Sequence, residues 1–349
     1  MEIVFICLAV FTIIASLMKL IKQDSWWIRF FDFPQVQFVI LGFISLGGLV
    51  YYWGFNDYKL LAVIVVLLAV LVYQCIIIFP YTWVAPSESK EIKEYHDRQK
   101  VSFMIANIYM YNRDYKRCIQ LVNDIDPDVL LLVETDKQWE EGMRSIDERY
   151  AYAVKYPIDN TYGMLLYSKL ELINPEVKFL VESDIPSIHT HIRLRNGEVS
   201  RLYALHPKPP SPTENLRSTE RDAELYLIAK EVEDVKTPVI VAGDLNDVAW
   251  SHSTRMFQRI SRLMDPRKGR GFFNTFHAKY PFLRWPLDHV FHSSEFGIAN
   301  IKRLPAIGSD HFPIYIDLIF VNDKAEEPLI EPATYEEREE ANAKIRAAL

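Results

Sequence analysis

The chain has few cysteines and lacks the glycine-rich loops that bind nucleotide phosphates. Cysteine accounts for 3 of its 349 residues, and no cysteine or histidine pattern typical of a complete zinc site occurs. Neither a G-x-x-x-x-G-K-[ST] loop nor a G-x-G-x-x-G segment is present, which argues against P-loop nucleotide hydrolases and dinucleotide-dependent oxidoreductases. Cys7 and Cys75 lie in apolar stretches, so Cys118 is the one cysteine in the remaining sequence. That part of the chain cannot form an internal disulfide, and cysteine usage does not indicate whether the domain lies in an oxidising or a reducing compartment.

Neither positive nor negative charge dominates the chain beyond its first quarter. The formal net charge is −7, from 39 basic and 46 acidic residues. After the apolar first quarter, acidic and basic residues are close to balanced, so no domain-wide positive field favours nucleic acid. Recognition of an anionic substrate would therefore depend on local clusters.

Long apolar runs are abundant in the first quarter. Three of them, at about residues 3–20, 36–54 and 60–79, approach or reach the roughly 20 residues needed to cross a bilayer and have no charge in their middle. They predict a membrane domain over residues 1–79 with three transmembrane helices. Buried helices of a soluble domain are the alternative, and a cleaved signal peptide is disfavoured because no basic residue precedes the first run.

The distribution of basic residues predicts which side of the membrane the rest of the chain occupies. One side has only Lys59, whereas the connections assigned to the other side contain several basic residues, namely Lys19, Lys22, Arg29, Lys90, Lys93, Arg98 and Lys100. By the positive-inside rule, the N-terminus faces outward and the large domain faces the cytoplasm.

The remaining chain divides into a linker, a large domain and a tail. Residues 80–100 are polar and charged with two prolines, as in a linker. Residues 101–321 alternate between strand-like and helix-like patterns, which predicts a mixed α and β domain. Residues 322–349 form an acidic C-terminal tail, which we interpret as a solvated charged helix.

Polar residues close several short apolar runs of this large domain. A buried strand that ends in a carboxylate, amide or imidazole delivers that side chain to one rim of a sheet. Oxygen and imidazole groups without cysteine are what a hard divalent cation and a phosphate need, so we predict metal-assisted phosphoester cleavage. The residues are Asn107, Glu134, His206, Asp244, Asn246, Asp288, Asp310 and His311.

The order and spelling of these segments resemble the endonuclease/exonuclease/phosphatase superfamily. An upstream PDVLLLVE, then LHP, GDLN, LDHV and SDH follow each other in the family's order between about residues 101 and 321. The resemblance implies an α+β chain in which N-terminal transmembrane helices precede a DNase I-like four-layered α/β sandwich. It is nearest to the bacterial membrane-anchored members, which implies a multi-pass protein of the bacterial inner membrane. Because related domains are often exported, the resemblance leaves the exported side open as the alternative to the cytoplasm.

The resemblance also implies a role for each polar residue. Glu134 would be the main ligand of Mg²⁺, with Mn²⁺ as a substitute, and Asn107 and Asp310 would contact the same ion. Asp244 would orient or deprotonate the attacking water and Asn246 would hold the phosphate. His206 would contact the scissile phosphate as a donor or general acid. His311, oriented by Asp288, would act as a general base or stabilise the transition state.

Each of these residues also has a plainer interpretation. Glu134 at a strand end can simply reach solvent, Asn107 can cap its strand, and GDLND is rich in turn formers. His289 and His292 are assigned structural roles, and strand alternation places His289 on the face opposite Asp288. His189 and His191 lack a third metal ligand and are expected on a surface strand.

Substrate-binding residues are less clearly marked. Arg255, Arg259 and Arg262 have helical spacing and precede Arg267, Lys268 and Arg270, and this basic stripe could hold phosphates or anionic lipid heads. A solvated helix face is the alternative. A smaller cluster contains Arg113, Lys116 and Arg117, Lys208 lies beside LHP, and Trp250, Phe282 and Trp285 could wall the site or pack in the core.

Three functions remain open from the sequence. The first is a membrane-anchored, metal-dependent phosphodiesterase or phosphatase acting on a lipid headgroup or small phosphate ester. The second is a membrane-tethered endonuclease or exonuclease on DNA or RNA, for which the basic stripe would be the binding surface. The third is a noncatalytic membrane scaffold, which the full set of catalytic residue types disfavours. Membrane lipids are expected partners, and no protein partner can be inferred.

Overall fold

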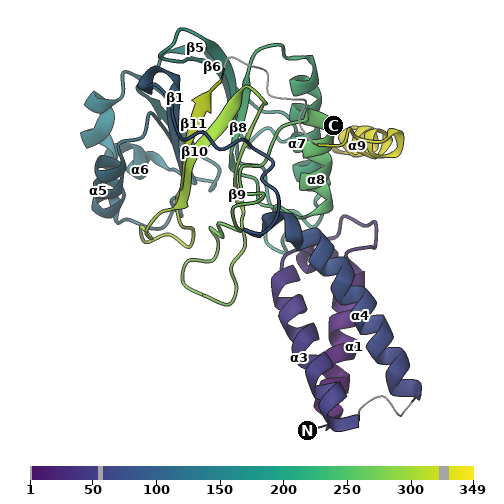
Figure 1. Cartoon of the computed structure of the whole chain (residues 1–349). Helices are drawn as coiled ribbons and strands as arrows, with labels where there is room; N and C mark the ends of the chain where they lie inside the picture. Colours follow the sequence, from purple (N-terminus) through teal and green to yellow (C-terminus); the bar gives the residue numbers. More distant parts are fainter. Residues whose placement is uncertain (1, 54–57, 322–329) are drawn as a thin grey trace.

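The computed structural model describes residues 2–53, 58–321 and 330–349. A bundle of apolar helices projects from one end of a sandwich of two β-sheets, and further helices cover both outer faces of the sandwich (Figure 1). The bundle comes from the first quarter of the chain. The sandwich therefore contains all the polar residues predicted to form the site.

Three long helices form the bundle. They are α1 (Glu2–Met18), α3 (Gln35–Trp53) and α4 (Tyr58–Ile78). Ala9, Leu49 and Leu67 are fully buried between them, whereas Phe43 and Val65 are more than half exposed on the outside. An apolar exterior of this kind suits lipid better than water.

Two of these helices are long and apolar enough to cross a membrane, by length and composition. The apolar segments are Gln35–Tyr52 and Leu60–Tyr81, while the apolar part of α1, Ile3–Met18, is shorter. The first of the three expected spans is thus a shorter apolar helix than the other two. Residue 54, at the end of the second expected span, lies outside the described residues.

The connection between α1 and α3 lies against the domain. It contains α2 (Trp26–Arg29) and a 3₁₀ turn, η1 (Phe30–Asp32). The backbone N–H of Trp26 donates to the carbonyl of Leu216 at 2.9 Å, and the indole N–H of Trp250 donates to the carbonyl of Asp32 at 2.8 Å. This loop therefore joins the bundle to the sandwich.

Residues 80–100, expected as a linker, also contact the domain along much of their length. They include part of the turn η2 (Phe79–Tyr81) and all of η3 (Asp97–Gln99). The buried Tyr81 hydroxyl donates to the carbonyl of Ala249 at 2.6 Å. The N–H of Ile92 donates to the carbonyl of Ile298 at 2.9 Å. These contacts fix the segment to the sandwich, so its polar composition does not reflect a free linker.

The first sheet has six strands in the order β10-β11-β1-β2-β4-β3. β1 is parallel to β2 and antiparallel to β11. Their aliphatic residues are buried on both faces, as expected of central strands covered on both sides. The strands are β1 (Lys100–Asn107), β2 (Val129–Val133), β3 (Tyr152–Tyr156), β4 (Met164–Ser168), β10 (Phe296–Arg303) and β11 (Ile314–Phe320).

The second sheet has five strands in the order β5-β6-β7-β8-β9. β7 and β8 are parallel, and β9 is antiparallel to β8 with Asp288 paired opposite Asp244. The strands are β5 (Leu172–Lys178), β6 (Ser187–Arg193), β7 (Val199–Leu205), β8 (Val239–Asp244) and β9 (Asp288–His292).

Helices cover the outer face of each sheet. Phe103, Leu131, Ile188 and Ile240 belong to the core between the sheets, and separate apolar clusters lie beneath the helices on the two outer faces. The four layers are consistent with the expected DNase I-like α+β sandwich. On the first sheet lie α5 (Tyr115–Ile125), α6 (Lys137–Gly142) and η4 (Arg144–Arg149), and on the second lie α7 (Thr219–Asp234), α8 (His252–Ser261) and α9 (Tyr335–Ala348).

The C-terminal helix α9 packs on the domain beside α7 (Figure 1). Ala341 and Ile345 are buried in the cluster beneath it. The Lys344 ammonium lies 2.6 Å from the buried carboxylate of Asp222 and 2.9 Å from that of Asp24. The expectation of a solvated tail is thus wrong for α9, because sparse apolar positions in a charged sequence still form one packed face. Residues 322–329 of that tail lie outside the described residues.

Replacing Lys344 tests this attachment. Burial alone would raise the pKa of Asp222, but Lys344 and Arg221 outweigh it and hold that pKa well below its usual range. We expect Lys344→Met to lower the free energy of unfolding by about 2 kcal/mol, less than for a wholly unpaired buried charge because Arg221 remains. Lys230→Met, which removes an exposed bond to Asn342 of α9, should cost less than about 0.5 kcal/mol. Urea unfolding of the two variants measures the difference, and equal effects would contradict the structural role.

Candidate active site

The polar strand ends meet at one edge of the two sheets. Asn107 ends β1 and Glu134 follows β2, its parallel neighbour. His206 follows β7, and Asp244 ends the parallel β8. Since the carboxyl ends of parallel strands meet at the same edge, each sheet contributes a pair of side chains. Asp288 begins the antiparallel β9 and therefore lies at the same edge as Asp244.

The side-chain amide of Asn107 joins the two sheets. Its Nδ2 donates to Oε1 of Glu134 at 2.6 Å and to Oδ2 of Asp244 at 3.0 Å. Its Oδ1 accepts from the backbone N–H of Tyr109 at 3.0 Å, which fixes the orientation of the amide. Glu134 also accepts from the N–H of Met110 at 3.3 Å. One amide thus holds two carboxylates from different sheets.

Backbone conformation contributes to this arrangement. Glu134 and Asn246 have φ values of 62° and 52°, in the left-handed region that non-glycine residues seldom occupy. Gly243 allows β8 to approach β7, because a Cβ at this position would lie 1.9 Å from the carbonyl oxygen of Leu205. The strained positions lie at the rim, where such strain is commonly found in functional sites.

His311 is held between two carboxylates. Its Nδ1 lies 2.8 Å from Oδ2 of Asp288, and its Nε2 lies 3.6 Å from Oδ2 of Asp244. The ring of Phe276 lies against the imidazole, with ring centres 5.0 Å apart. Burial lowers the pKa of His311, but Asp288 and Asp244 outweigh burial and raise it to about 10. Without a bound cation, His311 is therefore an imidazolium at neutral pH.

His206 has the opposite electrostatic character. It is buried, its Nε2 is 4.0 Å from Oδ2 of Asp244, and its ring packs against Tyr162 at 5.3 Å between centres. Burial lowers the pKa of His206 to about 4, so the ring is neutral at pH 7. Its Nδ1 has no hydrogen-bond partner within the described part of the chain. The rim thus contains one charged and one neutral imidazole.

Asn246 and Asp310 complete the predicted set. Asn246 donates through Nδ2 to the carbonyl of Pro207 at 3.0 Å, and its backbone N–H donates to Oδ1 of Asp244 at 2.9 Å. Asp310 is half-buried beside His311 and close enough to affect the pKa of Glu134. The structure therefore places all eight predicted residues at one rim.

The carboxylates of the rim lack cationic side chains apart from histidine. Among the described residues, no lysine or arginine forms an ion pair with Glu134, Asp244 or Asp288. Burial raises the pKa of Glu134 to about 7 and also raises that of Asp244. Buried carboxylates in this state are costly unless a cation offsets them. This donor set fits a divalent metal ion, in keeping with oxygen coordination of hard cations.

Two groupings of ligands are possible for such an ion. Ligand atoms of Asp244, Asp288 and His311 lie within 4.8 Å of one another. However, an ion bound among all three would have to displace the hydrogen bond between His311 and Asp288. Within the described residues, the oxygens of Glu134 accept only from N–H groups of Asn107 and Met110, so this carboxylate is the better ligand.

Several residues that support the rim gave no signal in the sequence. Arg221 is buried, forms ion pairs with Asp222 at 2.7 Å and Asp247 at 3.3 Å, and donates to the carbonyl of Asn246 at 2.9 Å. The hydroxyl of Thr275 accepts from the backbone N–H of Asp288 at 3.2 Å. Their partners Asn246, Asp247 and Asp288 are distant in the sequence, so no local pattern marks these contacts.

The basic stripe predicted after GDLN is largely used within the protein. Arg259 pairs with Glu337 at 2.9 Å, and Lys268 pairs with Glu88 at 3.1 Å. Arg267 is buried against Asp265, and Arg270 donates to the carbonyl of Ser89. Three members of the stripe are therefore held in ion pairs within the protein, whereas Arg255 and Arg270 form no ion pair among the described residues.

Two members of the smaller basic cluster are also paired. Arg113 and Arg117 bind Asp136 and Asp114, and Lys208 lies 3.7 Å from Glu182. Trp250 and Trp285 are buried in the cluster between domain and bundle, whereas Phe282 is exposed.

The histidines assigned structural roles fall into two groups. His289 and His292 are buried and bonded to Arg267 and Ser89, as expected of structural residues. His189 is fully buried beside Ser187, so its placement on a surface strand was wrong. The alternating pattern of β6 did not reveal that helices and loops cover both faces.

The fold and the rim site define an enzyme of the phosphoester hydrolase class. The family model of the Endonuclease/Exonuclease/phosphatase family matches residues 104–311. The chain belongs to this family, whose members hydrolyse phosphoesters and typically use divalent metals. No curated protein matches the chain significantly.

Solved structures share the fold at low sequence identity. An endonuclease/exonuclease/phosphatase from Beutenbergia cavernae has a TM-score of 0.52 and 17% identity, over 64% of this chain and 72% of that chain. The human Nocturnin catalytic domain has a TM-score of 0.52 and 16% identity, over 66% and 96%. A mannosyl-6-phosphatase from Bacteroides thetaiotaomicron has a TM-score of 0.51 and 17% identity, over 63% and 100%.

Substitution of Glu134 tests the electrostatics of the rim directly. Glu134→Gln keeps the shape and an acceptor for Asn107 but removes a buried negative charge. Because burial raises the pKa of Glu134 from 4.5 to about 7, the metal-free protein loses stability as pH rises between these two values, and the full cost is present above about pH 7. We therefore expect the variant to have an equal or higher Tm in EDTA and at least tenfold weaker Mn²⁺ binding by titration calorimetry. Glu148→Gln, at an exposed position, should change neither quantity.

Proposed function

We propose that the chain is a divalent-metal-dependent phosphoester hydrolase anchored to a membrane by its N-terminal helices. The observation that carries this proposal is the convergence at Asp244. The amide of Asn107 binds Asp244 and Glu134 together, and the imidazole of His311, held by Asp288, lies near the same oxygen of Asp244, Oδ2. This arrangement pairs a cation-binding carboxylate with groups able to activate water.

Glu134, Asn107 and Asp310 would hold Mg²⁺ or Mn²⁺. When bound, the ion supplies Lewis-acid stabilisation of negative charge on a phosphate oxygen. The residues fit because Glu134 retains acceptor capacity toward the rim and lacks a lysine or arginine partner among the described residues. Occupation of the site would offset the burial of this carboxylate.

The other residues would act on water and on the phosphate. Asp244, which is fully buried, would orient the attacking water and accept its proton. His311, charged through its pair with Asp288, and the nearby His206 would place N–H groups toward the phosphate and stabilise charge on its oxygens. Asn246 would hold the phosphate through its side chain, after exchanging its bond to the carbonyl of Pro207.

The substrate would be a small phosphate ester or a lipid headgroup. A nuclease receives less support, since the described basic residues near GDLN that would line a groove for nucleic acid are mostly in ion pairs. A noncatalytic scaffold is disfavoured because the complete set of acid, amide and imidazole groups is assembled with short contacts.

The membrane helices would keep the domain close to lipid. Apolar segments of α3 and α4 have the required length. The segment that follows α4 packs on the sandwich, so the domain would stay close to the bundle. By the distribution of basic residues the domain would face the cytoplasm, with the exported side as the alternative. We expect the full chain to remain in the membrane pellet after alkaline carbonate extraction. Release into the supernatant would contradict the anchor.

Hydrolysis by the full chain tests the activity. Detergent-solubilised protein would be assayed in Mg²⁺ or EDTA on single-stranded DNA, RNA, a phosphoinositide, sphingomyelin and glycerol 3-phosphate. We expect Mg²⁺-dependent release of a headgroup or phosphate. We expect Asp244→Asn and His311→Ala to lower turnover by about 10²–10⁴-fold, the range for general acid-base groups.

The controls separate loss of chemistry from loss of folding. Glu148→Gln should keep full activity, and every variant should still unfold in one cooperative thermal transition. Cleavage of nucleic acid alone would favour the nuclease. Retention of most activity by Asp244→Asn would refute the assigned site.

A further inference from the structure

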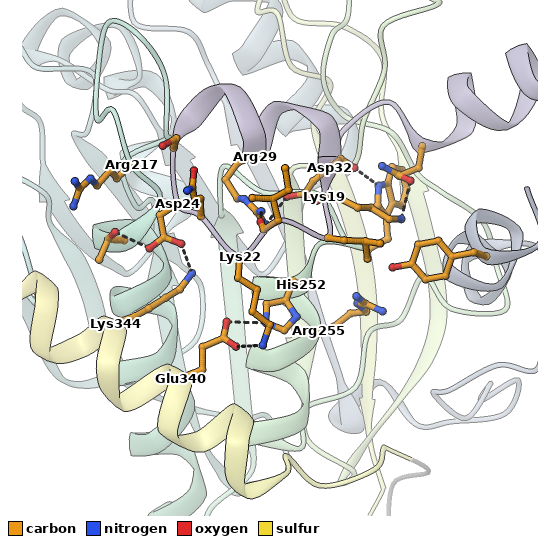
Figure 2. A pocket seen from close by; sticks show the side chains of 18 residues that line it. Lys19, Lys22, Asp24, Arg29, Asp32, Arg217, His252, Arg255, Glu340 and Lys344 are labelled. Carbon is orange, nitrogen blue, oxygen red and sulfur yellow. Dashed lines mark hydrogen bonds and ion pairs between the residues drawn. The ribbon is translucent and has the colours of Figure 1, made fainter. Parts of the chain in front are cut away.

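A second polar cavity lies where the helical bundle meets the sandwich. It has a volume of about 820 Å³ and is lined by the loop after α1, by α4, and by the first turns of α7 and α8, with residues of α9 at its side (Figure 2). None of the eight rim residues lines it. The cavity is therefore separate from the candidate active site.

Basic side chains outnumber acidic ones around this cavity. The acidic residues are Asp24, Asp32 and Glu340. The basic residues are Lys19, Lys22, Arg29, Arg217, Arg255 and Lys344. His252 adds an imidazole that can also carry charge.

Most of the acidic residues are already paired. Lys344 binds Asp24 at 2.9 Å, and Glu340 lies 2.8 Å from the imidazole of His252. Figure 2 shows these pairs on the side of the cavity formed by α9. That side of the cavity is electrostatically balanced.

The other side has an excess of positive charge. Asp32 is the acid there, and it already lies 3.3 Å from Arg29. Lys19 donates to the neutral Oε1 of Gln35 at 2.9 Å and lies over the ring of Tyr73. Arg255 donates through Nε to the carbonyl of Ser251 at 3.2 Å and lines the same cavity as Lys19. The Lys19 ammonium is attracted by Asp32 and, less strongly, repelled by Arg255.

Two further features of this side favour an anion. Arg29 is buried, 7% exposed, and its Nε has no hydrogen-bond partner within the described residues. Arg255 lies in the first turn of α8, where the helix dipole adds partial positive charge. Arg29 is buried and Lys19 is half-buried, whereas Arg255 is exposed at the edge of the cavity. An anion in the cavity would offset the positive charge that burial of Arg29 and Lys19 makes costly.

We propose that this cavity binds the phosphate group of an anionic ligand between Lys19 and Arg255. A phosphate at this point would receive hydrogen bonds from an ammonium and a guanidinium group, which bind phosphate oxygens well. The site is assigned no catalytic role, and it would exist whether or not the rim is active.

A lipid headgroup and a free phosphate ester could both supply this chemistry. The lipid source follows from position, since Lys19 comes directly after the apolar helix α1 and Leu20, Trp27 and Phe30 nearby are 48–55% exposed. Exposed apolar and aromatic residues beside basic ones are typical of a membrane interface. The lipid source rests on the membrane anchor proposed above, whereas the anion site does not.

Ligand titration of the full chain tests the site. Purified protein in a neutral detergent with EDTA would be titrated by calorimetry with dihexanoyl phosphatidylglycerol, dihexanoyl phosphatidylcholine and glycerol 3-phosphate. EDTA prevents metal-dependent turnover, so the outcome is independent of the activity at the rim. We expect the anionic lipid to bind at least tenfold more tightly than the zwitterionic one, and its affinity to fall as salt is raised.

Matched charge changes locate the binding. Lys19→Gln with Arg255→Gln should weaken binding of the anionic ligand at least tenfold. Arg98→Gln with Arg144→Gln removes the same charge at two exposed positions outside the cavity and should weaken it less than twofold. Should the first pair fail to fold, Arg255→Gln alone should weaken binding at least threefold. The rim variant Glu134→Gln should bind like the parent protein.

The comparison of ligands identifies the source. Tight binding of phosphatidylglycerol with weak binding of glycerol 3-phosphate would assign a lipid headgroup. Similar affinities for both would assign a free phosphate ester and still support the site. The proposed site would be overturned if neither phosphatidylglycerol nor glycerol 3-phosphate bound. It would also be overturned if the two charge-matched pairs of substitutions weakened binding equally.

Discussion

The hydrogen bonds of one amide, that of Asn107, set the geometry on which the rest of the site depends. They hold Glu134 from the first sheet and Asp244 from the second sheet, so the register of both sheets must be correct before the rim exists. Two carboxylates brought together in a buried place repel each other and lose hydration. The amide and the adjacent His311 offset only part of that cost, which is why the rim favours a cation. A site built this way is costly without its ligand and is stabilised when the ligand binds.

The helical bundle reaches this rim through a short series of aromatic contacts. The ring of Phe33, in the loop between bundle helices, packs on Trp285 with centres 5.7 Å apart. Trp285 stacks on Phe276 at 6.0 Å, and Phe276 packs on His311 at 5.0 Å. Tyr81 and the Trp250 indole add hydrogen bonds across the same interface. The bundle is thus a structural neighbour of the candidate active site, because loops next to the rim residues pack directly against it.

The charges of the domain are separated into two regions of opposite character. The rim collects carboxylates that have no lysine or arginine partner among the described residues, and the cavity beneath the bundle collects Lys19, Arg29 and Arg255 around a single buried acid. Elsewhere, basic residues such as Arg259 and Lys268 are neutralised by ion pairs with distant segments. Because paired charges contribute little net field, the two unbalanced regions are where ligands of opposite charge would be attracted. This distribution explains why the nearly neutral composition is uninformative about binding.

The sequence by itself determined the class of the fold and the members of the rim. Aliphatic runs ending in Asn107, Glu134 and Asp244 predicted buried strands with polar ends, since strand periodicity and burial are local properties of the chain. The tertiary structure alone decided which charges remain unpaired. The partner of Arg259 lies on α9 and that of Lys268 precedes the domain, and no local pattern encodes such pairings. For the same reason, the packing of α9 and the cavity between bundle and sandwich emerged only when segments distant in sequence were brought together.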